Sequence, residues 1–229
     1  MPRPASPLIR YDAVIATSLH IIDTEGLDAF SLPRLARALN VRAPSLYHHF
    51  ADKADILRGV ARAVVAETPM PDSAGVPNWI EWFVALSLNF RVAVLRHRNA
   101  APLLLQFMPR DILIRTYEQS ARFLAEVGVP RERRVLVLDG LDKLALSAAI
   151  TEASREPGES RELFGTADPA TEPTLADAVA CNHRSPEEIF ADTVRSFLRG
   201  AVPEVPDDVP APRQTPGQTV ADLSSPAAS

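Results

Sequence analysis

The sequence has few of the features that hold a protein in a membrane or in an oxidising compartment. Cys181 is the single cysteine among 229 residues, so no disulfide can form within the chain and a reducing compartment is expected. The longest stretch without a charged residue, 99–109, has 11 residues and is too short to span a bilayer. The N-terminus has no apolar signal core. We therefore expect a cytoplasmic protein without a membrane partner.

Positive charge is also scarce. The net charge is −5, which argues against general binding to nucleic acids. The charge is uneven, because residues 1–67 hold 8 basic and 7 acidic side chains, whereas the remainder holds 16 and 22. Within residues 31–53 there are four basic residues and one acid. A small basic patch on an acidic body is typical of a module that reads DNA.

Strand patterns are absent, since no segment alternates strictly between polar and apolar residues, and helical spacing predominates. The sequence thus predicts an all-α fold. We expect four parts: a helical segment at 8–67, a connector rich in proline at 68–78, a second helical domain at 79–200, and a disordered tail at 203–229. The expected helices cover 8–24, 32–39, 44–50, 52–67, 79–97, 100–107, 110–127, 132–153, 175–181 and 186–199.

Two short helices at 32–39 and 44–50, joined by the turn 40–43, have helix-turn-helix spacing. Ser31 and Asp52 are good N-caps for the first short helix and for the helix that follows the second. In such a motif the second helix inserts its N-terminal end into the major groove. We expect its outward face to carry small and polar residues that reach base edges or phosphates, together with Lys53 at the next helix start: Ala43, Ser45, Tyr47, His48 and His49.

The run FSLPRLARALNVRAPSLYHHFADKADIL, residues 30–57, resembles the DNA-binding signature of the tetracycline-repressor (TetR) family of bacterial regulators. The resemblance implies an N-terminal three-helix DNA-binding domain and a helical C-terminal domain for ligand binding and dimerisation. It also implies which residues face the DNA, among them Ser31 at the N-cap of the first short helix. These residues are Ser31, Arg42, Ala43, Pro44, Ser45, Tyr47, His48, His49 and Lys53.

A second run, LNFRVAVLRHRNAAPLL at 88–104, is similar to the ligand-binding domain of the tetracycline repressors. Phe90 matches an aromatic ligand contact there, while Leu104, Leu86 and Ser120 stand where those repressors use histidine, asparagine and glutamine. The resemblance therefore implies a more apolar pocket that does not bind tetracycline with magnesium. The expected lining is Leu86, Phe90, Leu104, Phe107, Met108, Tyr117, Ser120, Val135 and Leu138. An apolar stripe at helical spacing is equally consistent with plain core.

Several residues invite other readings. His48 and His49 could be metal ligands, but adjacent residues on a helix point about 100° apart, and neither cysteine nor carboxylates accompany them. Cys181 and His183 could form a nucleophile and base, yet no oxyanion loop or orienting acid is identifiable. We expect no catalytic residues, no metal and no cofactor.

The helices at about 133–153 and 186–199 are apolar over much of their circumference, which favours a homodimer through these segments. A two-fold dimer can read palindromic operator DNA with two recognition helices. The sequence thus predicts a ligand-responsive transcriptional regulator that acts as a repressor on double-stranded operator DNA and responds to a small-molecule effector. The alternatives are an all-α enzyme, or a sequestering ligand-binding protein, that retains a vestigial helix-turn-helix.

Overall fold

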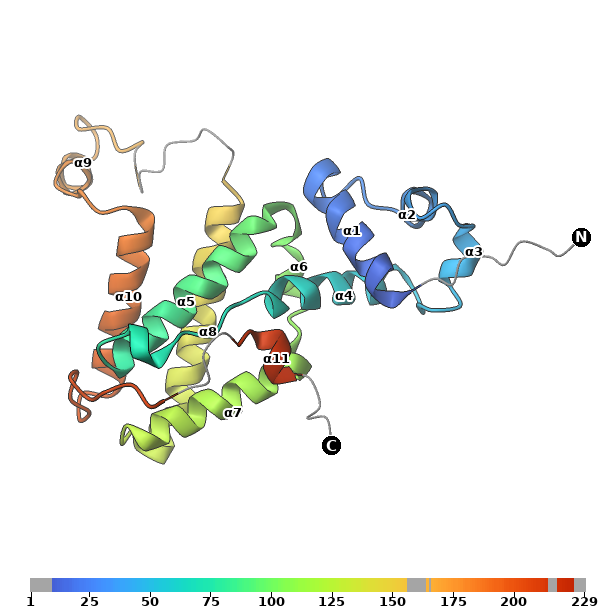
Figure 1. Ribbon diagram of the computed structural model, residues 1–229. Helices are drawn as coiled ribbons and strands as arrows, with labels where there is room; N and C mark the ends of the chain where they lie inside the picture. Colours follow the sequence, from blue (N-terminus) through green and yellow to red (C-terminus); the bar gives the residue numbers. More distant parts are fainter. Residues whose placement is uncertain (1–9, 156–163, 165, 214–217, 225–229) are drawn as a thin grey trace, which may run out of the picture.

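The computed structural model describes residues 10–155, 164, 166–213 and 218–224, and within them the chain is a series of helices (Figure 1). The predicted all-α class is confirmed, because the described residues form no strand and hold only an isolated antiparallel bridge between Pro69 and Thr219. In chain order the α-helices are α1 (Tyr11–Glu25), α2 (Leu32–Ala38), α3 (Ala43–Leu46), α4 (Lys53–Ala66), α5 (Trp79–Arg96), α6 (Leu103–Gln106), α7 (Arg110–Glu126), α8 (Arg131–Ala153), α9 (Pro173–Ala180), α10 (Pro186–Ala201) and α11 (Val220–Ser224).

The first three helices and the first half of α4 form one end of the molecule, and their boundaries follow from local signals. Gly26, at φ 90°, ends α1, and Asn40, at φ 53°, lies in the turn that follows α2. The side chain of Ser31 accepts from Arg34 N at 3.3 Å, and that of Asp52 accepts from Asp55 N at 2.7 Å. Both predicted N-caps are thus confirmed. Apolar side chains from all four helices close the small core between them.

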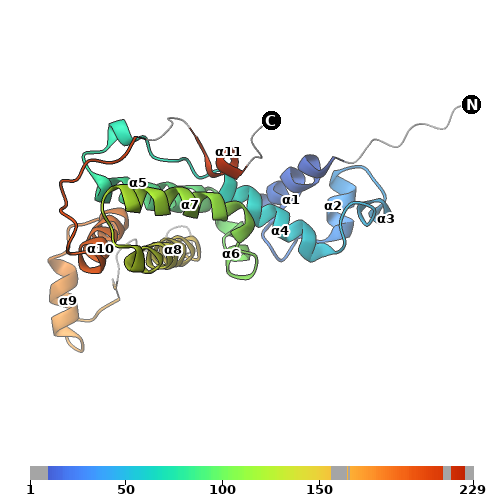
Figure 2. The ribbon, with the colours of Figure 1, turned by 90° about the horizontal axis from the view of Figure 1, so that it is seen from below.

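The C-terminal helices form a bundle in which α5 and α7 lie on one side and α8 and α10 on the other (Figure 2). Trp79, Trp82, Phe83 and Phe123 fill the region between α5 and α7, and the rings of Trp82 and Phe123 stack with centroids 4.5 Å apart. Helix α9 projects from the bundle and has no buried residue. Among the described helices, none is both long and apolar enough to cross a membrane.

Two arginines fix the bundle's helices to one another. Arg91 of α5 is buried and donates from Nε and Nη2 to the two carboxylate oxygens of Glu152 on α8, each at 2.8 Å. Arg195 of α10 donates in the same two-pronged way to Glu81 on α5, each at 2.7 Å. Such paired hydrogen bonds define orientation as well as distance, so α5 is held in register with both α8 and α10.

The predicted disordered tail is wrong for the residues that the structure describes. Residues 203–213 run along the bundle, where the indole Nε1 of Trp79 donates to Pro206 O at 2.9 Å. Residues 218–224 lie against α7 and α4, and Val205 and Val220 are buried. The prolines, which suggested disorder, suit an extended segment whose backbone bonds to its neighbours at intervals. Residues 214–217 and 225–229 lie outside the described residues.

Candidate DNA-binding surface and ligand pocket

The helix-turn-helix is built from α2, the turn at 39–42 and α3. Val41 N donates to Ala36 O at 3.0 Å across the turn, which fixes the angle between the two helices. Helix α3 is shorter than predicted: it ends at Leu46, and 47–49 form a turn in which Phe50 N still bonds to Leu46 O at 3.0 Å. Leu46 and Phe50 are the buried underside, and the ring of Tyr11 stacks on Phe50 with centroids 5.3 Å apart.

The opposite face of this motif is open to solvent. The predicted DNA-facing residues gather there: Arg42, Pro44, His48 and His49 are exposed, Tyr47 is 59% exposed, and Ala43, Ser45 and Ser31 are half-buried. A tyrosine ring that is so accessible contributes little to a core, so its position is compatible with contact to an external partner. That these residues touch DNA stays a prediction.

Lys53 differs from the other predicted contacts, because its side chain is already engaged. Its Nζ donates to Phe30 O at 2.8 Å and lies 5.4 Å from the centroid of the Phe30 ring. The lysine stands at the first position of α4, after Asp52. It therefore joins the start of α4 to the loop before α2, and a phosphate would have to share or replace this bond.

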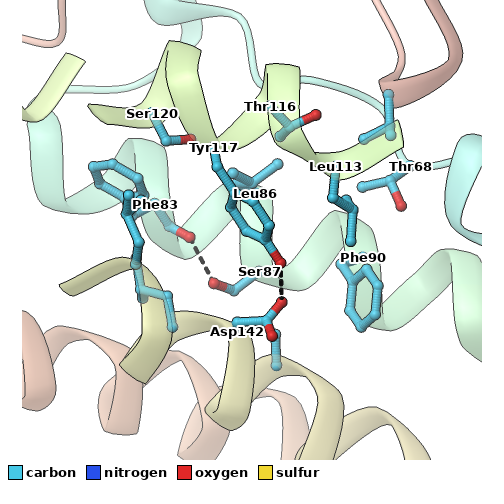
Figure 3. A pocket seen from close by; sticks show the side chains of 14 residues that line it. Thr68, Phe83, Leu86, Ser87, Phe90, Leu113, Thr116, Tyr117, Ser120 and Asp142 are labelled. Atoms are coloured by element: carbon cyan, nitrogen blue, oxygen red, sulfur yellow. Dashed lines mark hydrogen bonds between the residues drawn. The ribbon is translucent and has the colours of Figure 1, made fainter. Parts of the chain in front are cut away.

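A pocket lies inside the C-terminal bundle between α5, α7 and α8 (Figure 3). The volume open to the centre of a water molecule is about 90 Å³. Its lining is largely apolar and comes from five segments: Thr68, Phe83, Leu86, Ser87, Phe90, Leu113, Thr116, Tyr117, Ser120, Leu138, Leu141, Asp142, Ala145 and Val220. Such a concave, mostly apolar space with a few polar groups is the usual form of a small-molecule site.

The structure brings five of the nine predicted lining residues together at this pocket: Leu86, Phe90, Tyr117, Ser120 and Leu138. The other four are elsewhere. Leu104 is 1% exposed and packs in the core, because the short helix α6 lies against α4. Phe107 and Met108 are half-buried against the core after α6, and Val135 is 75% exposed near the start of α8. The placement of these four in the lining is therefore wrong.

Part of the remaining lining could have been found from helical spacing. Leu141, Asp142 and Ala145 follow Leu138 at three, four and seven residues, and Phe83 precedes Leu86 by three. Thr68 and Val220 carried no such signal, since one is in the connector and the other is far along the chain in a segment without periodicity.

Two polar groups of the pocket are paired with each other. The hydroxyl of Tyr117 donates to Asp142 Oδ1 at 2.8 Å, from α7 to α8 (Figure 3). Burial, and then the hydrogen bond to the nearby carboxylate, raises the pKa of the Tyr117 hydroxyl far above its usual value. The phenol is thus a permanent donor at neutral pH, and Asp142 is its acceptor.

Comparison with known proteins finds a family match in the N-terminal part of the chain. Residues 14–60 match the family described as bacterial regulatory proteins, tetR family. Tetracycline repressor protein class E of Escherichia coli is 26% identical over 163 residues, which cover 69% of this chain and 75% of that protein.

Solved structures extend the similarity through the C-terminal bundle. ActR, a TetR family protein of Streptomyces coelicolor solved with actinorhodin, is 25% identical with a TM-score of 0.68, covering 86% of this chain and 97% of ActR. BioQ, solved with its natural double-stranded DNA operator, shares the fold at 20% identity and a TM-score of 0.59, with 82% and 99% covered. The helix-turn-helix, the helical bundle and these similarities lead to one conclusion: residues 14–60 belong to the tetR family of bacterial regulatory proteins, and the chain as a whole is similar to TetR family regulators in sequence and in fold.

Proposed function

We propose that the protein is a cytoplasmic, homodimeric transcriptional repressor that binds a palindromic operator and releases it when a small, largely apolar effector enters the bundle. One observation carries this proposal: α4 joins an exposed helix-turn-helix to the bundle that holds an apolar pocket. BioQ with its operator and ActR with actinorhodin are relatives in fold that each hold one of the two kinds of partner.

DNA binding is supported by the charge and shape of the helix-turn-helix. Arg42, the N-cap of α3, supplies a cation next to the exposed Tyr47, and the small residues between them leave room for base edges. Arg34 is already held by Glu25, whose carboxylate accepts from its Nε at 3.0 Å. We assign phosphate contact to Arg42, to backbone N–H groups and to Lys53, which would exchange its bond to Phe30 O for one to phosphate.

Coupling between the two sites is supported by the position of α4. This helix packs on α1 at one end and on α5, α6 and α11 at the other. His97, at the end of α5, links the same elements, since its Nδ1 lies 2.8 Å from Asp23 Oδ2 of α1 and its Nε2 lies 3.2 Å from the carboxylate of Glu67. An effector that shifts α4 would move the helix-turn-helix, and by reciprocity it would bind the DNA-free form more tightly.

A homodimer through about 133–153 and 186–199 is supported by the surface of α8 and α10. Val135 and Leu136 are exposed on α8, and a groove between α8 and α10 is lined by Leu144, Ala148, Ile189 and Phe190. Exposed apolar side chains on one helix beside an apolar groove are typical of an association surface. Two copies related by a two-fold axis would present two recognition helices.

The decisive experiment maps the binding sites of the protein on the source genome and tests the recovered operator with purified variants. Arg42→Ala and Tyr47→Ala should weaken operator binding, and Arg42→Ala should lower the slope of log Kd against log salt by about one. Arg122→Ala, which removes the same charge from the exposed surface of α7, is the matched control. Absence of operator binding by the unchanged protein would favour an enzyme or a sequestering protein.

A variant that fills the pocket tests whether the effector acts there. Leu86→Trp, on the α5 wall, should retain operator binding but no longer release DNA with the effector. An unchanged release by this variant would remove the pocket from the proposal.

A further inference from the structure

Two buried hydroxyl groups have no hydrogen-bond partner among the residues that the structure describes. Thr68 is 2% exposed and Thr116 is 6% exposed, and the Oγ1 atom of each is buried without a partner. A buried hydroxyl that loses its water without gaining another partner destabilises the fold, and valine would occupy almost the same space without this penalty. Groups of this kind require an explanation.

Both threonines line the apolar pocket, although they come from different elements. Thr68 follows α4 by two residues, and Thr116 lies on α7. In Figure 3 they lie toward one end of the pocket with Leu113 and Phe90, whereas Phe83 and Ser120 lie toward the other end. The pocket thus has one end at which two hydroxyls stand unpaired among apolar walls.

The C-terminal segment covers this end. Val220 is buried and lines the pocket, and its backbone N donates to Thr68 O at 3.0 Å. On the other side of the isolated bridge, Met70 N donates to Gln218 O at 2.7 Å. Helix α11 packs on α7, which carries Thr116 (Figure 2). A molecule at the threonine end would therefore be enclosed by residues 218–222.

The charge of the lining selects among ligands. Among the described residues that line the pocket there is no arginine, lysine or histidine, and Asp142 supplies a carboxylate that accepts from Tyr117. An anionic ligand would lose its hydration and meet a like charge without a cation to balance it. A neutral ligand avoids both penalties.

We propose that the pocket takes an uncharged, largely apolar molecule with a hydroxyl or carbonyl oxygen at one end, which bonds to Thr68 and Thr116 beneath the docked segment 218–222. The inference rests on the proposed function, because it names the chemistry of the effector. A threonine hydroxyl can donate to a carbonyl and can also accept from a hydroxyl, so both oxygen functions fit. The link from Thr68 to the end of α4 places the polar contact next to the helix that carries the DNA-binding end.

The test uses three two-ring probes with the full-length protein: naphthalene, 2-naphthol and 2-naphthoate. Fluorescence titration at pH 7 should give 2-naphthol a Kd about 3- to 30-fold lower than that of naphthalene, as expected for one or two net hydrogen bonds. The anion 2-naphthoate should bind more weakly than naphthalene. Thr68→Val and Thr116→Val should each reduce the advantage of 2-naphthol while leaving naphthalene affinity unchanged.

The same variants have a second readout that separates ligand recognition from a structural role. Each valine should raise the Tm of the free protein, because it removes an unpaired buried hydroxyl. Thr24→Val is the control, since its hydroxyl donates to His20 O at 2.7 Å on α1, outside the pocket. It should lower or leave unchanged the Tm and should not alter the ratio of the probes.

The outcomes distinguish this inference from the proposed function. If 2-naphthol binds no better than naphthalene, or if its advantage survives in the double valine variant, the assignment of the oxygen function is overturned while the pocket remains a ligand site. The genes next to the mapped operators suggest candidate effectors. If neither the probes nor these candidates bind, both this inference and the ligand-binding part of the proposed function are overturned.

Discussion

Gly140 of α8 lies directly under the ring of Phe197 on α10: a Cβ atom at position 140 would stand 2.1 Å from Cζ of that ring. The absence of a side chain at Gly140 lets these two helices approach closely. Because α8 and α10 are the segments proposed to form the dimer, this contact links the packing of one chain to its association with another.

Gly140→Ala should therefore loosen α8 from α10. The ring of Phe197 must turn away, and overpacking of this kind costs about 1–3 kcal/mol. We expect a lower Tm and a weaker dimer by analytical ultracentrifugation. Gly200→Ala is the control within α10, because its Cβ would meet no atom within 4 Å, and it should stabilise the helix by about 0.5–1 kcal/mol.

The partner substitution makes the argument specific. Phe197→Leu in the Gly140→Ala background should restore part of the lost stability, so the two changes should be strongly non-additive. Additive effects would show that the cost at Gly140 arises elsewhere.

Deletion of residues 203–229 should destabilise the protein. The deletion removes the buried Val205 and Val220 and the Pro206 carbonyl that accepts from Trp79. The deletion exposes the apolar surface that these valines cover and removes the partner of the Trp79 indole, so we expect a lower free energy of unfolding and a lower Tm. Thermal unfolding measures both.

Deletion of residues 225–229 alone is the matched control, because it retains Val205, Pro206 and Val220. If the two deletions give the same Tm as the full chain, the docking of the C-terminal segment contributes nothing to stability.

The sequence predicts those parts of the fold that depend on short-range signals. Helix α5 was expected at 79–97 and covers Trp79–Arg96, since its cap at Asn78 and its apolar spacing are local. Ser31 and Asp52 were recognisable as caps for the same reason. The docked tail was not predictable, because Val205 and Val220 are isolated valines whose burial depends on surfaces formed by distant helices.

The pocket shows the same limit. The lining residues on α5, α7 and α8 recur at helical spacing, but this spacing does not distinguish a pocket from a core, and Phe90 is expected in the lining because it matches an aromatic ligand contact of the tetracycline repressors. Leu104 was assigned through a resemblance in register, but the local direction of α6 turns it into the core. Thr68 and Val220 meet only because the connector and the C-terminal segment pair through backbone hydrogen bonds, which no side-chain pattern encodes.

Lys53→Met should show whether Lys53 contacts phosphate in the operator complex or only stabilises the fold. The variant keeps most of the apolar stem over Phe30 but loses the charge and the bond to Phe30 O. If Nζ reaches a phosphate in the complex, operator affinity should fall and the slope of log Kd against log salt should decrease by about one. Fluorescence anisotropy over a salt series measures both.

Arg122→Met is the control, since Arg122 is exposed on α7, outside the segments proposed for the dimer, and pairs with Glu118 at 2.7 Å. A fall in the Tm of Lys53→Met with an unchanged salt slope would assign Lys53 a structural role only.

The pair of Glu81 and Arg195 should make stability depend on pH in the acid range. The hydrogen bonds from Arg195 hold the pKa of the Glu81 carboxyl below its ordinary value of 4.5. Because the folded pKa is the lower one, the stabilisation is complete above about 4.5 and is lost as the pH falls through the folded pKa. The group is partly exposed, so we expect its share to be about 1 kcal/mol or less.

Urea unfolding from pH 7 to pH 3 tests this with Glu81→Gln, which should lower stability at pH 7 and approach the unchanged protein at pH 3. Glu118→Gln, which disrupts an exposed pair with Arg122 on α7, should have almost no effect across the range. The sign of the difference is the critical observation. If Glu81→Gln loses more stability at pH 3 than at pH 7, the carboxylate is not stabilised by Arg195, and the register of α10 against α5 must depend on apolar packing instead.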